Sequence, residues 1–188
     1  MTVSVEEFSL YVLDIVMNSV RAGAENIDVT LDDRSGLLTF TVKDDGCGMT
    51  KDQLERLTDP FFTTRKTRGV GLGVPFLKML AEQTGGDVDV SSVSVSDSPE
   101  SHGTTLVATF HSDHIDFIPM GDIKDTFITL IQGNPGVNFT FVHVKDGGEV
   151  RLSCRELRSV LGDDVPLSNA EVLAWIRGYL AEAYDEIK

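Results

Sequence analysis

The segment Asp59–Phe76 has residues that could bind an anion. It reads DPFFTTRKTRGVGLGVPF, and Gly69, Gly71 and Gly73 alternate just before an apolar helical pattern. Such glycines allow positive φ and bring backbone N–H groups close to an anion, and the following helix directs its positive end toward the same place. Many ordinary turns look similar, so this segment becomes specific only together with other motifs.

Three polar side chains form a second candidate. The apolar residues of the stretch 5–22 are spaced as in a largely buried helix, and within it Asp14, Asn18 and Arg21 follow one another at i, i+4 and i+7. This spacing aligns a carboxylate, an amide and a guanidinium along one stripe of the helix. The stripe is either a solvated helix edge or part of a functional site, and its neighbours in the fold decide between the two.

A third candidate lies where a strand pattern ends in the sequence DDGCGMT, residues 44–50. The carboxylate of Asp44 only accepts hydrogen bonds, so at a strand end it suits an amine of a ligand. Gly46 and Gly48 follow it, with the small Cys47 between them. An ordinary Asp-Gly turn explains the same residues, and this alternative stays open.

The elements expected around these motifs predict an α+β fold. Up to residue 112 the pattern gives a helix, a hairpin, a short helix after Thr50, a flexible loop, a helix and a second hairpin. We therefore expect a two-layer α/β sandwich with a mixed, mostly antiparallel sheet and helices on one face. Beyond it, a helix over 119–132, a hairpin near Asp146 and two helices, the last capped by Ser168, predict a small C-terminal α/β appendage.

The composition argues against several classes of protein. Acidic residues outnumber basic ones 30 to 16, and the net charge of −14 opposes binding to nucleic acid. Cys47 and Cys154 have neither metal-site spacing nor a disulfide framework, which suits a reducing compartment. No apolar run has membrane-spanning length, and the acidic N-terminus is unlike a signal peptide. We expect a cytoplasmic protein that binds neither nucleic acid nor membrane.

Neither glycine motif continues to G-x-G-x-x-G, and no G-x-x-x-x-G-K-[ST] occurs, so a Rossmann or P-loop site is not expected. Four segments instead resemble, in order and spacing, the four boxes of the GHKL ATP-binding superfamily: LDIVMNSVRAGA, VKDDGCGM, DPFFTTRKTRGVGLG and HGTTLVATF. Its members include sensor histidine kinases, anti-sigma kinases, DNA gyrase, heat-shock chaperone ATPases and MutL. The resemblance implies a histidine kinase-like ATPase domain (Bergerat fold) at 1–112 and a C-terminal extension of unknown role at 113–188.

The resemblance also implies roles for the polar stripe. Asn18 matches the asparagine that binds Mg²⁺ through its side-chain oxygen, a hard ligand for a hard cation. Asp14 stands one helical turn earlier, where anti-sigma kinases and MutL place a glutamate that activates the attacking hydroxyl or water. Here the residue is a shorter aspartate. Arg21 matches a basic residue of histidine kinases that can neutralise phosphate.

The remaining motifs imply the two ends of an ATP site. Asp44 matches the aspartate that accepts the exocyclic amine of adenine, and Gly46 and Gly48 give the turn beside the ring. Thr104 and Thr105 lie on the strand whose threonine helps to hold adenine, although both could be ordinary strand threonines. The lid and the second glycine box would contact the phosphates; they comprise Thr63, Thr64, Arg65, Lys66, Arg68, Gly69, Val70, Gly71, Leu72 and Gly73.

The branch of the superfamily decides the expected function. A sensor kinase would carry a phosphoacceptor histidine ahead of this site, and the 13 residues before Asp14 contain none. MutL or gyrase would have a longer lid. We therefore expect a stand-alone module that uses ATP and Mg²⁺ to phosphorylate or regulate a protein partner, as anti-sigma kinases do, and that could form a homodimer. The alternative is a non-catalytic ATP-sensing module whose lid ordering changes partner binding.

Overall fold

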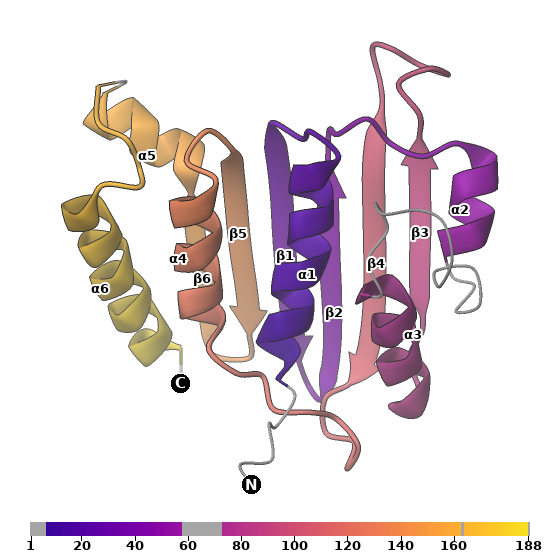
Figure 1. Cartoon of the computed structure of the whole chain (residues 1–188). Helices are drawn as coiled ribbons and strands as arrows, with labels where there is room; N and C mark the ends of the chain where they lie inside the picture. Colours follow the sequence, from indigo (N-terminus) through magenta and orange to yellow (C-terminus); the bar gives the residue numbers. More distant parts are fainter. Residues whose placement is uncertain (1–6, 58–72, 163, 188) are drawn as a thin grey trace, which may run out of the picture.

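The computed structural model describes residues 7–57, 73–162 and 164–187, and Figure 1 shows their arrangement. The helices and strands alternate along the chain much as the sequence predicts. In chain order they are α1 (Phe8–Arg21), β1 (Asn26–Arg34), β2 (Leu37–Asp44), α2 (Lys51–Leu57), α3 (Gly73–Gln83), β3 (Val88–Val93), β4 (Gly103–His111), α4 (Ile123–Gly133), β5 (Asn138–Lys145), β6 (Gly148–Ser153), α5 (Cys154–Leu161) and α6 (Ala170–Glu186).

The strands form one sheet in the order β3-β4-β2-β1-β5-β6. Neighbouring strands pair antiparallel, except that β1 and β5 pair in parallel from Asn26 opposite Asn138 to Asp33 opposite Lys145. The predicted α+β fold with a mixed, mostly antiparallel sheet is thus confirmed. The parallel pair joins the C-terminal segment to the same sheet, and the boundary between 1–112 and 113–188 stays a prediction.

Helices α1, α3, α4 and α6 lie on one face of the sheet (Figure 1). Strand β1 shows why the helices cover only one face. Ile27, Val29 and Leu31 are buried toward the helices, while Asp28 between them is exposed. Alternation of this kind gives a strand one apolar and one polar face. Helix α1 therefore packs over the centre of the sheet, where its polar stripe can meet the strand ends.

Aromatic side chains fill the space between the layers. Phe8 of α1 meets Phe40 of β2 and Phe110 of β4 edge to face, with ring centroids 5.6 and 5.2 Å apart. Phe127 of α4 stacks on Phe141 of β5 at 3.8 Å. Aromatic pairs in these geometries stabilise a core by more than the burial of their surface area alone. The core thus continues from the N-terminal strands under α4 into the C-terminal segment.

Two predicted helix starts were wrong in position. The helix expected over 119–132 spans Ile123–Gly133, because the Asp122 side chain accepts a hydrogen bond from the first turn and caps it. The last helix is capped by Asn169 and not by Ser168, since the Asn169 side chain accepts from a first-turn N–H group. No described helix has the length and apolar character needed to cross a membrane.

Candidate functional site

A cavity of about 730 Å³ lies between α1, the sheet and the loop after β2. Its walls are apolar where the core reaches it, through Ile15, Val42, Val74, Val90 and Leu106. Polar groups enter it from the end of α1 and from the ends of β2 and β4. An apolar cavity of this size with a few polar groups is typical of a small-molecule site.

Asp44 is held in this cavity by two hydrogen bonds. The hydroxyl of Ser19 donates to Oδ2 at 2.6 Å, and the backbone N–H of Gly46 donates to Oδ1 at 2.9 Å. Each carboxylate oxygen keeps a lone pair free for a ligand. Thr104 lies directly across from Asp44 on β4 and also lines the cavity. Ser19 is buried, and no pattern in the sequence indicates its role, because only the fold brings it to Asp44.

The loop after Asp44 is wedged between the end of α1 and the end of β3. Its backbone at Cys47 accepts from Val95 N at 2.8 Å and donates to the Ala22 carbonyl at 2.9 Å. Gly48 has φ +64°, and a Cβ there would overlap the carbonyl of Val93. The tight loop therefore requires glycine at this position, and it presents exposed Cys47 at the cavity.

The polar stripe of α1 divides between two adjoining hollows. Asn18 and Arg21 line the cavity, and Arg21 Nη1 donates to Asn18 Oδ1 at 2.9 Å. Asp14 lines a groove of about 300 Å³ between α1 and α3. At the start of α3, Gly73 lies so close to the Asp14 side chain that a Cβ added at Gly73 would overlap Asp14 Oδ2.

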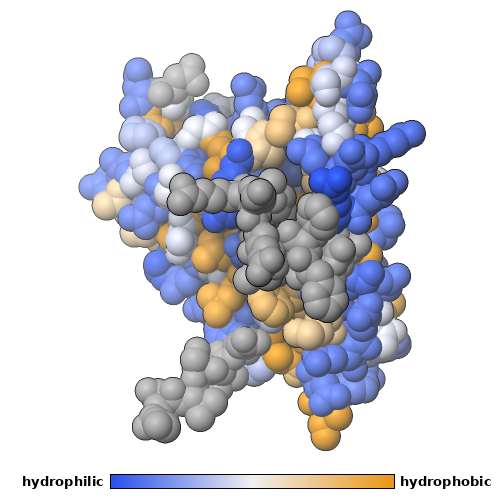
Figure 2. Space-filling view, turned by 45° about the vertical axis from the view of Figure 1, so that its right-hand side comes forward, coloured by the Kyte–Doolittle hydropathy of each residue, from blue (hydrophilic) through white to orange (hydrophobic). Residues whose placement is uncertain are grey.

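Exposed apolar side chains flank that groove. Leu10 of α1 and Phe76 and Met79 of α3 line it, and each is about half exposed. Figure 2 shows hydrophobic side chains gathered in the middle of this side of the molecule, between hydrophilic margins. The carboxylate of Asp14 is therefore reached from an apolar surface.

The donor set of the cavity fits a magnesium ion bound together with phosphates. The amide oxygen of Asn18 is a hard ligand, and Arg21 uses only one of its lone pairs. Within the part of the chain that the structure describes, no three His, Cys, Asp or Glu side chains gather as a metal site. An ion here would depend on Asn18, on ligand phosphates and on water.

The structure brings together a subset of the predicted site residues. Those that line the cavity are Asn18, Arg21, Asp44, Gly48 and Thr104. The backbone N–H group of Gly46 donates a hydrogen bond to Asp44, and Gly73 contacts Asp14. Thr105 is not brought to the cavity, because neighbouring side chains of a strand point to opposite faces. The other predicted lid and glycine-box residues, 63–66 and 68–72, lie outside the described residues.

Comparison with known proteins gives a family match and sequence relatives. A profile of the family described as histidine kinase-, DNA gyrase B- and HSP90-like ATPase matches residues 5–114. An uncharacterized sensor-like histidine kinase of Rhizobium meliloti (strain 1021) is 34% identical over 115 residues, covering 56% of this chain and 20% of that protein. Sensor histidine kinase WalK of Bacillus subtilis (strain 168) is 34% identical over 108 residues, covering 52% and 17%. The chain thus spans about a fifth of the length of these relatives.

Two solved structures share the fold. The Aquifex aeolicus MutL ATPase domain, complexed with ADP, matches with a TM-score of 0.52 at 14% identity, covering 90% of this chain and 86% of that chain. The N-terminal domain of a DNA repair protein matches with a TM-score of 0.53 at 21% identity, covering 84% and 57%. Because these matches cover so much of the chain, the shared fold extends past residue 114 into the C-terminal segment.

Proposed function

The chain belongs to the histidine kinase-, DNA gyrase B- and HSP90-like ATPase family, and from this we propose that its cavity binds ATP with Mg²⁺. The observation that carries the proposal is the Asp44 carboxylate, which Ser19 and Gly46 hold at an apolar cavity. The exocyclic amine of adenine donates to Asp44, and the ring packs on the apolar walls. Thr104 supplies a second polar contact at this end.

The phosphates extend toward the end of α1. Asn18 would hold Mg²⁺ through Oδ1, and the positive charge of Arg21 offsets phosphate charge at the rim of the cavity. When bound, the ion would neutralise part of the charge on the phosphate oxygens. The MutL ATPase domain named above, which shares the fold, was solved in complex with ADP, and this supports a nucleotide as the ligand.

We further propose that the protein is a regulatory kinase or ATPase that acts on a protein partner. Asp14 serves as the general base: it takes the proton of an acceptor hydroxyl or water as the acceptor oxygen bonds to the γ-phosphorus and ADP leaves. The groove beside Asp14 opens to solvent, so an acceptor has access. The sensor kinases among the sequence relatives favour a protein acceptor.

A specific observation favours the alternative of a non-catalytic, ATP-sensing module. Asp14 lines the groove and is not among the residues around the cavity, and its side chain is shorter than a glutamate. A carboxylate held too far from the acceptor would allow binding without turnover. In that case the bound ATP changes the affinity for the partner, and no ADP is formed.

Binding is tested by titration calorimetry with ATP and Mg²⁺. Asp44→Asn replaces a carboxylate, which only accepts hydrogen bonds from the adenine amine, by an amide that also donates. We expect at least about tenfold weaker binding of ATP. Asp28→Asn, an exposed carboxylate on the other face of the sheet, is the matched control and should bind as the wild type does. Wild-type protein that binds no ATP would refute the proposal.

A thiol assay checks the location of the nucleotide. Cys47 is exposed and lines the cavity, whereas Cys154 is buried, and burial raises the pKa of the Cys154 thiol. Maleimide should therefore label Cys47 selectively, because thiolate is the reactive form. At an ATP concentration near the wild-type Kd, ATP should slow this labelling more in the wild type than in Asp44→Asn. Equal rates with and without saturating ATP would place the nucleotide elsewhere.

Turnover separates the two functions. Asp14→Asn should leave ATP affinity unchanged and lower ADP release and transfer of labelled γ-phosphate to protein by about 100-fold or more. If wild-type protein binds ATP but neither releases ADP nor transfers phosphate, the sensing module is favoured. If Asp14→Asn turns over at the wild-type rate, another group is the base.

A further inference from the structure

Asp45, the residue after Asp44, connects the loop that follows β2 to the start of β1 by hydrogen bonds. Its Oδ1 accepts hydrogen bonds from the backbone N–H groups of Glu25 and Asn26 at 2.8 and 2.9 Å. Its Oδ2 accepts from the side-chain amide of Asn26 at 2.6 Å. Burial acts to raise the pKa of Asp45, but these hydrogen bonds, with that of the Asn26 side chain foremost, hold it below its usual value. The ionised carboxylate therefore fixes the start of the loop to β1, and we call the hydrogen-bonded pair of Asp45 and Asn26 the clamp.

The amide of Asn26 can take only one orientation in this clamp. Its Oδ1 accepts from Arg155 of α5 at 2.6 Å and from the side chain of Asn138 at 3.3 Å. A guanidinium only donates and a carboxylate only accepts. The oxygen must consequently face Arg155, and the NH₂ group must face Asp45.

Helix α5 is itself fixed to the start of β5. Arg158 donates to the side chain of Asn138 and to the backbone carbonyls of Pro135 and Val137, at 2.5 and 3.1 Å for the carbonyls. Asn138 is the residue that pairs with Asn26 where β1 and β5 begin their parallel register. A continuous polar path thus runs from α5, beyond the family match, to the residue beside Asp44.

We infer that Asn26 is a positioning residue of the nucleotide site, oriented by Arg155, so that the segment beyond residue 114 helps to build the site. Asn26 holds Asp45, which directly follows Asp44 and begins the loop that contains Gly46 and Gly48. Gly46, whose N–H group donates to Asp44, follows directly. The inference rests on the proposed function, because its readout is affinity for ATP.

The test exchanges the two partners of the clamp. Asn26→Asp sets two carboxylates against each other, and Asp45→Asn sets two amides against each other; each should weaken ATP binding about tenfold. In the double variant the amide introduced at position 45 keeps an oxygen for the two backbone donors and donates to the carboxylate at position 26. Affinity should return to within about twofold of the wild type.

The pH dependence distinguishes positioning from general loss of structure. In Asn26→Asp, like charges raise the pKa of one carboxylate, so the affinity for ATP should recover as the pH falls from 7 toward 5. Asp45→Asn should lack this recovery. Urea unfolding of each variant reports the folded fraction, so that affinity is expressed per folded molecule.

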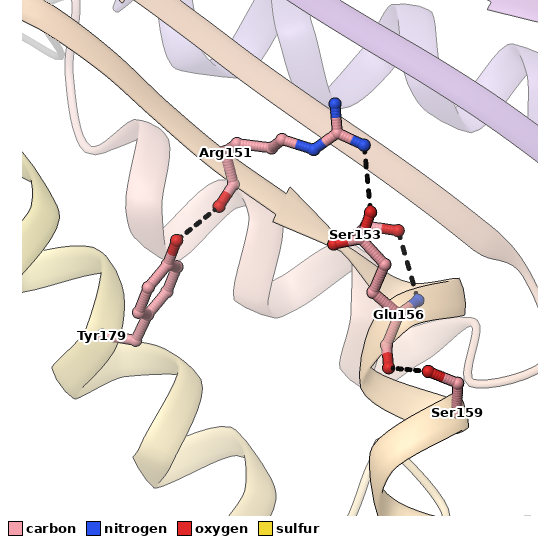
Figure 3. Close-up of polar contacts among 5 residues, drawn as sticks. All are labelled: Arg151, Ser153, Glu156, Ser159 and Tyr179. Carbon is pink, nitrogen blue, oxygen red and sulfur yellow. Dashed lines mark hydrogen bonds and ion pairs between the residues drawn. The ribbon is translucent and has the colours of Figure 1, made fainter.

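The contribution of α5 is tested by Arg155→Leu, with Arg151→Leu as the matched control. Arg151 lies on β6 and pairs with Glu156 at 3.1 Å (Figure 3). Arg155→Leu should weaken ATP binding about threefold to tenfold, and Arg151→Leu should not. Because Arg155 is exposed, its substitution tests the path even where a clamp variant does not fold.

The outcomes separate the inference from the proposed function. If the wild type binds ATP while the folded clamp variants and Arg155→Leu bind equally well, the inference is refuted and the proposed function stands. A double variant that binds no better than the weaker single variant also overturns it. If the wild type binds no ATP, the proposed function fails and the inference fails with it.

Discussion

Mild acid should destabilise the protein through one histidine, His143 on β5. The residue is 3% exposed, its Nδ1 lies 2.7 Å from the hydroxyl of Tyr184 on α6, and its buried Nε2 has no hydrogen-bond partner among the described residues. Burial lowers the pKa of His143 from 6.5 to about 4; the charge of Lys145 adds to this and that of Asp33 opposes it. The folded protein therefore keeps the imidazole neutral where an unfolded chain is protonated.

The size of the effect follows from the two pKa values. Between pH 6.5 and 4 the unfolded chain binds more protons at this position than the folded protein, so the free energy of unfolding falls as the pH falls. The full loss, below pH 4, is about 3 kcal/mol. At pH 5, where most carboxylates are still ionised, the loss relative to pH 7 is about 2 kcal/mol. That is a large part of the 5–15 kcal/mol typical of a domain.

Urea denaturation at pH 7 and pH 5 measures this loss. His143→Asn does not titrate, and its amide can still hydrogen-bond to the hydroxyl of Tyr184. Its stability is lower at both pH values because a cavity is left, but its pH dependence should be smaller than that of the wild type by about 2 kcal/mol. His114→Asn, at an exposed position, should keep the wild-type dependence. The same pH dependence in all three proteins would refute the argument.

Two further substitutions test the cavity. Gly48→Ala should lower the free energy of unfolding by about 2 kcal/mol or more and weaken ATP binding, since φ is +64° and the added Cβ meets the Val93 carbonyl. Thermal denaturation and calorimetry measure both, and Gly178→Ala, at an open position of α6, should be neutral or stabilising. Ser19→Ala removes the 2.6 Å hydrogen bond to Asp44 and should weaken ATP binding about fivefold in a titration, with Ser19→Thr retaining more affinity. An unchanged affinity in Ser19→Ala would show that Asp44 needs no such support.

Features with local determinants could be predicted from the sequence. The alternation of Ile27, Val29 and Leu31 places β1 under the helices, and the spacing of Gly46 and Gly48 gives the loop beside the cavity. In each case the deciding residues lie within a few positions of one another. The polar stripe of α1 was predicted as one group for the same reason.

The members of the stripe differ in their position along α1, and the elements that each position meets could not be predicted. Asp14 lies one turn, about 6 Å, before Asn18, and there it meets the start of α3 instead of the cavity. The choice between Thr104 and Thr105 depends likewise on register, since only Thr104 shares the face of the cavity. Such information comes from pairing with distant strands.

Contacts between distant segments could not be predicted. No local pattern pairs Asn26 with Asn138, and no pattern brings Ser19 to Asp44. From the sequence the C-terminal segment is predicted to be an appendage, because a strand pattern does not reveal which strand pairs with it. The parallel pairing of β1 and β5 places that segment beside the start of β1, where Arg155 contacts Asn26.

The same pairing sets an order of events during biosynthesis. Residues leave the ribosome from the N-terminus, so β2 can join β1 early, while β5 reaches β1 only after Lys145 has been made. Arg155, the partner of Asn26, follows later still. The hydrogen bonds that support Asp45, the residue after Asp44, are therefore complete only once α5 has been made.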